Sequence, residues 1–225
     1  MKIIIVGRGK LAKAILTSNL SFPNSEIISW DNLSQDLNEK AIFVHAGSGR
    51  QLDDCLSYCS RTDSTFIELS TGLKTENISP NFTVITCPNT SILLLKTLNI
   101  LREFGKYFES YKISITESHQ STKKSIPGTA FNFAKSLKFP TDKIRSIRDS
   151  HQQLNEIGIP TEFLDNHAYH RITIEDGTDI VTIETKVLGH KSYANGVKKI
   201  IDAVLKYKLE KRRYSVIELV DKNML

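Results

Sequence analysis

The sequence has few of the features that point to a secreted or membrane-bound protein. Only three of its 225 residues are cysteine, and an odd, sparse set argues against a framework of disulfide bonds. The longest apolar stretch, around Ile92–Leu95, is too short to span a bilayer. The first residues, MKIIIVGRG, begin with a strand-like run and lack the layout of a cleavable signal. We therefore expect a cytoplasmic protein with no membrane partner.

Metal-binding and nucleic-acid-binding patterns are also missing. Cys55 and Cys59 have helical spacing, but no Cys or His cluster completes a site, so two half-buried thiols are favoured. His167 and His170 lack a third ligand, which favours structural or surface roles, and we predict no metal. The net charge of +5 lies partly in the basic run Lys206–Arg213. No aromatic stacking pattern accompanies this run, so a solvated helix end is favoured and no nucleic-acid partner is expected.

The first 90 residues alternate between short apolar strands and helices. Strands are expected at Lys2–Val6, Glu26–Trp30, Ala41–His45, Thr65–Leu69 and Thr83–Thr86, and helices at Leu11–Thr17 and Gln51–Tyr58. This alternation predicts an α/β fold with a doubly wound parallel sheet of the Rossmann type.

After residue 90 the pattern becomes that of a mixed-sheet α+β domain. Helices are expected at Ser91–Phe108, Ala130–Leu137 and Ala194–Tyr207, with strands at Ile113–Glu117, Tyr169–Glu175 and Asp179–Lys186. The last two strands flank Asp176-Gly177 and predict an antiparallel hairpin. We therefore predict two domains, residues 1–90 plus 194–225 and residues 91–193.

The segment from Gly7 to Ala12 fits the pattern G-x-G-x-x-A directly after a strand and before a helix. In such a loop the first glycine allows a tight turn, the second lets the backbone approach a diphosphate, and helix amide groups face the phosphates. Asp31 follows Gly7 by 24 residues, a spacing typical of a carboxylate that binds the adenosine ribose. A purely structural turn is the alternative, but the context favours NADH or NADPH as cofactor.

Preference between the two cofactors is left open by the residues near the loop. Asp31 favours NADH because a carboxylate repels a 2′-phosphate, whereas Arg8 and Lys10 could offset that repulsion.

Ligands of open α/β sheets bind beyond the carboxyl ends of strands. The predicted cofactor-binding residues are Gly7, Arg8, Gly9, Lys10, Leu11, Asp31, Ala46, Gly47, Ser70, Thr71, Gly72, Pro88 and Asn89.

The densest polar chemistry lies between Glu117 and Thr129. His119 can hold or move a proton near neutral pH, and Lys123 adds a positive charge four residues later. Gly128 and Thr129 precede a helix and offer amide groups to an anion. On chemistry alone, a site that binds a carboxylate and donates a proton is balanced against an ordinary polar loop.

This segment, Glu117–Ala130, resembles the E-x-H-H-x-x-K-x-D-x-P-S-G-T-A signature of the dihydrodipicolinate reductase (4-hydroxy-tetrahydrodipicolinate reductase) family. The resemblance covers nearly the whole chain. Other similar segments are the glycine loop, Ser70-Thr71-Gly72, Cys87–Ser91, Tyr193–Gly196 and Tyr214–Leu225.

The resemblance implies that NADH or NADPH reduces a small anionic cyclic dicarboxylate, dihydrodipicolinate, to tetrahydrodipicolinate in lysine biosynthesis. By position, His119 and Lys123 are the implied catalytic residues. The implied substrate-binding residues are Gln120, Lys123, Gly128, Thr129 and His190. The first domain would then bind the dinucleotide, and the second would bind substrate. The family is usually tetrameric through the second domain's sheet, so the hairpin Tyr169–Lys186 is expected to form a homo-oligomer.

Four departures from the family's pattern concern the substrate more than the cofactor. Gln120 replaces the second histidine, Ser125 stands where an aspartate is usual, and the serine between Pro127 and Gly128 is missing. His190 stands where an arginine is usual, and only arginine gives a permanent bidentate cation. A related imine or amino-acid reductase or dehydrogenase therefore stays open. A non-catalytic dinucleotide sensor is a third hypothesis, although the intact His119 and Lys123 argue against it.

Overall fold

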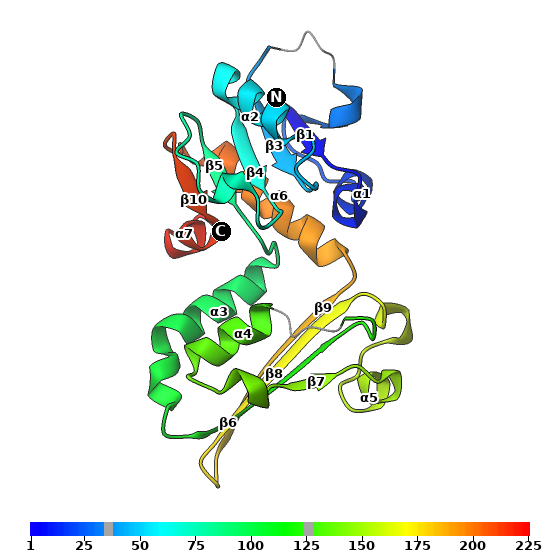
Figure 1. The fold of residues 1–225 in the computed structure, drawn as a ribbon, viewed down its shortest axis with the longest axis vertical. Coiled ribbons are helices and arrows are strands. Elements are labelled where there is room, and N and C mark those ends of the chain that lie inside the picture. Colours follow the sequence, from blue (N-terminus) through cyan, green and yellow to red (C-terminus); the bar gives the residue numbers. More distant parts are fainter. Residues whose placement is uncertain (34–37, 124–127) are drawn as a thin grey trace. The chain divides into compact units, whose positions relative to one another are not determined.

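The computed structural model describes residues 1–33, 38–123 and 128–225, and the chain divides into two compact units (Figure 1). Unit 1 comprises Met1–Ile92 and His190–Leu225, and unit 2 comprises Leu93–Gly189. The boundaries expected from the sequence lay at residues 90/91 and 193/194. His190, expected in the second domain, therefore belongs to unit 1.

Unit 1 is built on a six-stranded sheet in the order β10-β5-β4-β3-β1-β2, and all its strands pair in parallel. The strands are β1 (Lys2–Val6), β2 (Glu26–Ser29), β3 (Ala41–His45), β4 (Thr65–Glu68), β5 (Val84–Thr86) and β10 (Arg213–Ser215). All residues of β3 and β4 are buried, as expected for central strands of a sheet covered on both faces. The predicted doubly wound parallel sheet is confirmed.

Helices cover the unit 1 sheet. They are α1 (Lys10–Thr17), α2 (Leu52–Thr62), α6 (Lys191–Lys206) and α7 (Val216–Asp221). Successive strand residues point to opposite faces, and Phe43 and Phe66 pack with α2 residues in one apolar cluster. Helices α1 and α6 pack against each other. The carboxyl ends of β1, β3, β4 and β5 come together at one edge of this sheet, where the loops of interest begin.

Several elements of unit 1 differ from the expectation, and helix α2, predicted to end at Tyr58, runs to Thr62. Strand β2 ends at Ser29, so the strand predicted to reach Trp30 is one residue too long, and Asp31 lies in a 3-10 turn. Strand β10 and helix α7 were not predicted. Ser215 begins α7 by accepting a hydrogen bond from the Glu218 amide at 3.1 Å, which is a helix-capping pattern visible in the sequence.

Unit 2 contains a four-stranded mixed sheet in the order β7-β6-β8-β9 (Figure 1). Its strands are β6 (Lys112–His119), β7 (Arg145–Ile147), β8 (His167–Glu175) and β9 (Ile180–Leu188). Strands β6 and β7 are parallel, whereas β6–β8 and β8–β9 are antiparallel. The predicted hairpin and the predicted mixed sheet are therefore confirmed.

The helices of unit 2 are α3 (Ile92–Phe104, beginning at the last residue of this part of unit 1), α4 (Gly128–Ser136) and α5 (Ser150–Asn155). The helix predicted for Ser91–Phe108 is too long, because a 3-10 turn replaces the α-helix after Phe104. Strand β6 was predicted to end at Glu117 but runs to His119, and neither β7 nor α5 was predicted. No helix in the described ranges is both long enough and apolar enough to cross a membrane.

Candidate active site

The glycine loop of unit 1 has the backbone geometry that close approach requires. Gly7 has φ +131°, and a Cβ there would overlap the carbonyl oxygen of Ala46. Gly9 is the N-cap residue before α1; a Cβ there would meet nothing within 4 Å, and no side chain caps the helix. The first amide groups of α1 therefore stay available, as an anion-binding helix end needs.

A cavity of about 520 Å³ opens at this loop. It brings together five predicted cofactor residues with three that the sequence analysis did not single out, and its lining is Gly7, Arg8, Gly9, Ala46, Gly47, Ser48, Arg50 and Gln51. Arg50 donates from Nε to the Ser48 hydroxyl at 3.2 Å. Two guanidinium groups thus stand beside exposed glycine backbone, a combination that suits a dinucleotide's phosphates.

Arg8 and Asp31, which favour opposite cofactors, bind each other. Arg8 Nε lies 2.9 Å from Asp31 Oδ2, and a second guanidinium nitrogen lies 3.0 Å from Oδ1. The hydrogen bond from Arg8 lowers the pKa of Asp31 below its ordinary value. Asp31, the carboxylate predicted to bind the adenosine ribose, is therefore ionised and already paired with the Arg8 guanidinium.

The other predicted cofactor residues occupy different places around the same sheet edge. Ser70 donates from Oγ to the Gly47 carbonyl at 2.7 Å, and the Gly72 amide donates to Glu76 at 2.7 Å. Lys10 and Thr71 are exposed. A second cavity of about 270 Å³ is lined by Leu11, Leu69, Cys87, Pro88, Asn89, Thr90, His190 and Tyr193. His190, predicted to bind substrate, therefore lies in unit 1 with predicted cofactor residues.

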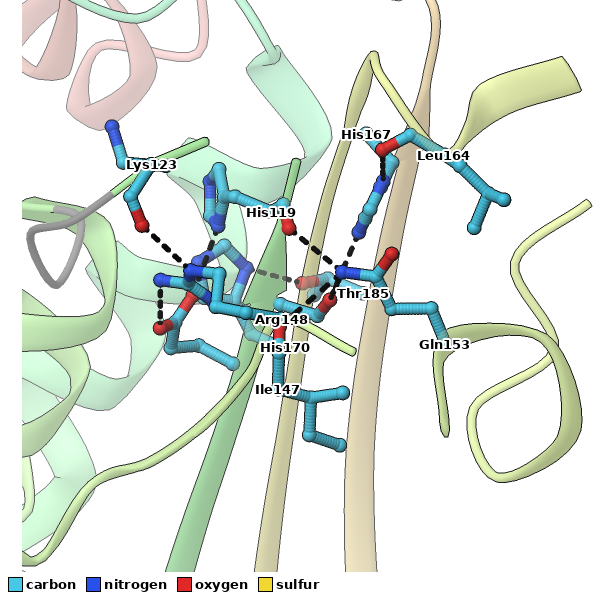
Figure 2. A network of polar contacts seen from close by, with 11 residues as sticks. His119, Lys123, Ile147, Arg148, Gln153, Leu164, His167, His170 and Thr185 are labelled. Carbon is cyan, nitrogen blue, oxygen red and sulfur yellow. Dashed lines mark hydrogen bonds and ion pairs between the residues drawn. The ribbon is translucent and has the colours of Figure 1, made fainter. Parts of the chain in front are cut away.

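In unit 2, a buried carboxylate organises the polar network drawn in Figure 2. Glu117 has no exposed surface; its Oε2 lies 2.9 Å from His119 Nδ1, and its Oε1 accepts from Arg148 at 2.6 Å. Glu117 and His119 are two apart on β6, so their side chains leave the same face of the sheet. This period-2 spacing is a signal by which the pair could have been recognised in the sequence.

The electrostatics of Glu117 fix the tautomer of His119. Burial alone would raise the pKa of Glu117, but hydrogen bonds from His119, Arg148 and Ser146 outweigh it and lower the pKa to about 2. An ionised carboxylate can only accept hydrogen bonds, so Nδ1 of His119 must donate. This leaves Nε2 as the atom of His119 that gains or loses a proton.

Arg148, which the sequence analysis did not identify, connects this pair to the predicted catalytic lysine. Its Nε donates to the Lys123 carbonyl at 2.9 Å, while another guanidinium nitrogen donates to the Ile147 carbonyl at 2.9 Å. In Figure 2 the Lys123 amine points away from the Arg148 guanidinium. Arg148 therefore fixes the backbone at Lys123 without engaging its charge.

A second set of contacts fixes the backbone of His119. Gln153 on α5 donates from Nε2 to the His119 carbonyl at 2.8 Å and to Ser118 Oγ at 3.1 Å. Burial lowers the pKa of His167, whose Nδ1 meets the Phe163 carbonyl at 3.0 Å and whose Nε2 lies 2.9 Å from Ser118 Oγ. A neutral His167 therefore donates from Nδ1 and accepts from Ser118.

His170 places a neutral ring beside His119. It pairs with Glu117 across β6 and β8, and its ring centroid lies 5.8 Å from that of His119. Burial, and secondarily the charge of His119, lower the pKa of His170 to about 3. Both His167 and His170 are buried, so a surface role is wrong for each, and both rings pack near the candidate catalytic histidine.

The remaining predicted substrate residues lie around the two ends of the loop after β6. The Lys123 amide donates to the Gln120 carbonyl at 3.0 Å in a turn, and Gly128 and Thr129 are the first two residues of α4. Ser125 and Pro127 lie outside the described residues. Across residues 1–33, 38–123 and 128–225, no three His, Cys, Asp or Glu side chains gather as a metal site would need.

The sequence of unit 2 and its continuation identify the family. Residues 94–220 match the family model described as "Dihydrodipicolinate reductase, C-terminus". The chain belongs to the dihydrodipicolinate reductase family. The matched range contains His119, Lys123 and Arg148, and it also extends over α6 and β10 of unit 1.

Individual relatives agree with this family. The chain is 33% identical over 143 residues to "4-hydroxy-tetrahydrodipicolinate reductase 2, chloroplastic" of Arabidopsis thaliana, a match that covers 57% of this chain but only 40% of that protein. It is 25% identical over 208 residues to the "4-hydroxy-tetrahydrodipicolinate reductase" of Rickettsia canadensis, covering 85% of this chain and 87% of the relative.

A solved structure shows that the fold is shared over the full length of the chain. Dipicolinate-bound dihydrodipicolinate reductase from Paenisporosarcina sp. TG-14 superposes with a TM-score of 0.67 at 15% sequence identity, covering 98% of this chain and 99% of that one. The unit 1 sheet and the unit 2 mixed sheet are thus the two-domain architecture of this family.

Proposed function

We propose that the chain is a reductase that uses NADH or NADPH to convert dihydrodipicolinate, a small cyclic dicarboxylate, into tetrahydrodipicolinate. The observation that carries the proposal is the Glu117–His119 pair, held by Arg148 within the segment that matches the family. The family relatives named 4-hydroxy-tetrahydrodipicolinate reductase support the same reaction.

In this proposal, unit 1 binds the dinucleotide through backbone and arginine. A dinucleotide fits the cavity at the glycine loop because Gly7 and Gly9 leave backbone amide groups uncovered and because Arg8 and Arg50 line it. A reduced nicotinamide, when bound, supplies the hydride. The residues of this chain bind the phosphates and orient the carrier.

Unit 2 would bind the dicarboxylate and manage the proton. His119 holds or releases a proton at Nε2, because Nδ1 is committed to Glu117. Lys123 and the amide groups of Gly128 and Thr129 at the start of α4 are suited to a dianion. Removing the orienting carboxylate of Glu117 would free the imidazole to rotate and to change tautomer.

A related imine or amino-acid reductase is the second candidate. Gln120 stands where the family signature has a second histidine, and His190 stands where an arginine is usual. The family resemblance implies that both residues contact the substrate. A different residue at each of these positions would therefore favour a different substrate.

The decisive assay couples the chain to dihydrodipicolinate synthase and follows the oxidation of NADH and of NADPH. We expect turnover with the synthase product, and we expect His119→Gln to lower kcat by about 100-fold or more, as for a lost general acid. His151→Gln is the matched control, because His151 is exposed on α5 and its side chain is not part of the network, and this variant should keep full activity. Turnover only with other imines would favour the second candidate, and wild-type rates in both histidine variants would exclude His119 from the mechanism.

We also propose a homotetramer assembled through the unit 2 sheet. Strand β9 is an edge strand, and its Ile180 and Val181 are 65% and 50% exposed. An exposed apolar edge favours pairing with another copy. Light scattering should give four times the mass of the chain, and Val181→Lys should lower that mass; a monomer at micromolar concentration would contradict the proposal.

A further inference from the structure

Two ionisable side chains are buried together in unit 1, outside every set of residues considered above. His45 is the last residue of β3, Glu68 is the last residue of β4, and the two are direct partners in the parallel pairing. Both are fully buried, and His45 Nδ1 lies 2.7 Å from Glu68 Oε1. The ring of His45 stacks on Phe66 with centroids 5.8 Å apart. The pair therefore lies next to the apolar cluster that Phe66 forms with residues of α2.

Glu68 holds the loop that follows β4. Its Oε1 accepts from the Ser70 amide at 2.9 Å, and its Oε2 accepts from the Thr75 hydroxyl at 3.2 Å. Together with His45 Nδ1, they give the buried carboxylate three polar partners, as a buried polar group requires. The buried side chain of Glu68 therefore fixes the start of the Ser70-Thr71-Gly72 loop.

His45 supports the loop that follows β3. A Cβ on Gly47 would lie 3.1 Å from His45 Nε2, so the imidazole lies directly under the Gly47 backbone. Ser70 ties the two loops together by donating from Oγ to the Gly47 carbonyl at 2.7 Å. Nε2 itself is buried and finds no hydrogen-bond partner in the part of the chain that the structure describes.

Stability alone is a weak reason for this arrangement. Replacing both partners of a buried hydrogen bond by apolar side chains of similar shape is often nearly neutral for stability, because removing the two polar groups from water costs about as much as their contact returns. What the pair does provide is geometry, since the contact joins side chains at the ends of β3 and β4 and each partner holds one loop. One of those loops, at Ala46 and Gly47, lines the 520 Å³ cavity.

We propose that His45 and Glu68 are positioning residues of the dinucleotide site, which hold the loops after β3 and β4 in the shape that receives the cofactor. The inference rests on the proposed function, because it assigns these two loops to a dinucleotide. Neither side chain takes part in the chemistry. Their effect is expected on cofactor affinity, and not on the proton transfer at His119.

The test separates positioning from stability. Glu68→Gln places an amide nitrogen near the Ser70 amide or the imidazole, and it should raise the Kd for NADH, measured by calorimetry, about tenfold through one lost hydrogen bond. In the double variant His45→Phe with Glu68→Met, apolar groups replace both partners. We expect this variant to keep the wild-type Tm while its Kd for NADH stays raised by a similar factor.

A matched control and a nucleotide-free readout complete the design. Cys59→Ala removes a buried side chain from the same apolar cluster, and it should lower Tm without changing the Kd. Hydrogen exchange at the Ser70 amide should accelerate in both Glu68 variants in the absence of nucleotide. If the double variant binds NADH as tightly as the wild type, this inference is overturned, whereas the proposed function is not. Absence of NADH and NADPH binding by the wild type would overturn the proposed function and this inference with it.

Discussion

The two candidate sites are built from different parts of the polypeptide. In unit 1, glycine stands at positions 7, 9 and 47 of the larger cavity's lining, beside a helix start that no side chain caps. In unit 2 the network consists of side chains, with a buried carboxylate that accepts hydrogen bonds from imidazole and guanidinium groups. A backbone site depends on what is absent at a few positions, whereas a side-chain site depends on every partner being present.

This difference predicts how each site fails. An unwanted Cβ damages a backbone site through overlap and strain, and the effect is confined to that position. Removing one member of a buried polar network leaves the others without partners, and the lost stability exceeds the value of the single contact. Substitutions in the two units therefore allow the comparison to be tested directly.

The largest effect is expected from Arg148 in unit 2. Arg148→Met leaves the charge of Glu117 buried without its cation, and it should lower the free energy of unfolding by about 3–5 kcal/mol. Urea denaturation measures this change. Arg145→Met is the matched control, because Arg145, at the start of β7, makes an exposed bidentate ion pair with Glu156. Surface pairs contribute little, so equal losses in the two variants would contradict the comparison.

Acid should weaken unit 2 through Glu117. Its folded pKa of about 2 lies below the ordinary value of 4.5, so the stability it contributes is complete above pH 4.5, declines as the pH falls and is gone below pH 2. The shift corresponds to about 3 kcal/mol. His170 acts in the same direction between its ordinary value of 6.5 and about 3, because the folded state favours the neutral ring.

Variants can isolate this acid dependence. In Glu117→Gln, the difference in unfolding free energy from the wild type should be greatest above pH 4.5 and should narrow toward pH 2. His170→Phe should flatten the stability profile between pH 6.5 and 3. Urea titrations at several pH values measure both. A constant difference across the acid range would show that the ionisation of Glu117 does not contribute.

Glycine substitutions test the backbone site of unit 1. Gly7→Ala forces a Cβ onto the Ala46 carbonyl at φ +131°, and it should cost about 2 kcal/mol of stability and remove NADH binding. Gly9→Ala meets no atom within 4 Å, so Tm should not change. Its affinity for NADH should still fall about tenfold if the diphosphate lies against this backbone. Unchanged binding in Gly9→Ala would place the diphosphate elsewhere.

The contrast between the units also explains what the sequence could predict. Buried parallel strands such as Ala41–His45 are recognisable because the signal is local, and so is a glycine loop between a strand and a helix. Strand β10 is only three residues long and becomes a strand through pairing with β5, more than 120 residues earlier in the chain. Short polar segments of this kind carry no periodic signal of their own.

The side-chain network could not be predicted from local sequence patterns for the same reason. His119 was singled out by its chemistry and given a catalytic role through a resemblance to a family motif, and Glu117 lies two residues before it on the strand. Arg148, however, reaches Glu117 from 31 residues away, and it does so because β7 pairs in parallel with β6. The pairing β6–β8 likewise brings His170 beside Glu117. Contacts of this type require the tertiary fold to be known.

The smallest expected effect concerns an exposed ion pair at the unit 1 site. Arg8 and Asp31 are exposed and bind each other, so each limits the other's influence on the adenosine end of the cofactor. Asp31→Asn should shift the ratio of Kd values by about tenfold toward NADPH, because the carboxylate no longer repels a 2′-phosphate and Arg8 is released to bind it. Arg8→Met should shift the ratio toward NADH, and Lys13→Met, exposed on α1, should leave it unchanged. Opposite shifts in the two variants follow only if the pair itself sets the preference; a shift in the same direction would mean that neither residue contacts the 2′ position.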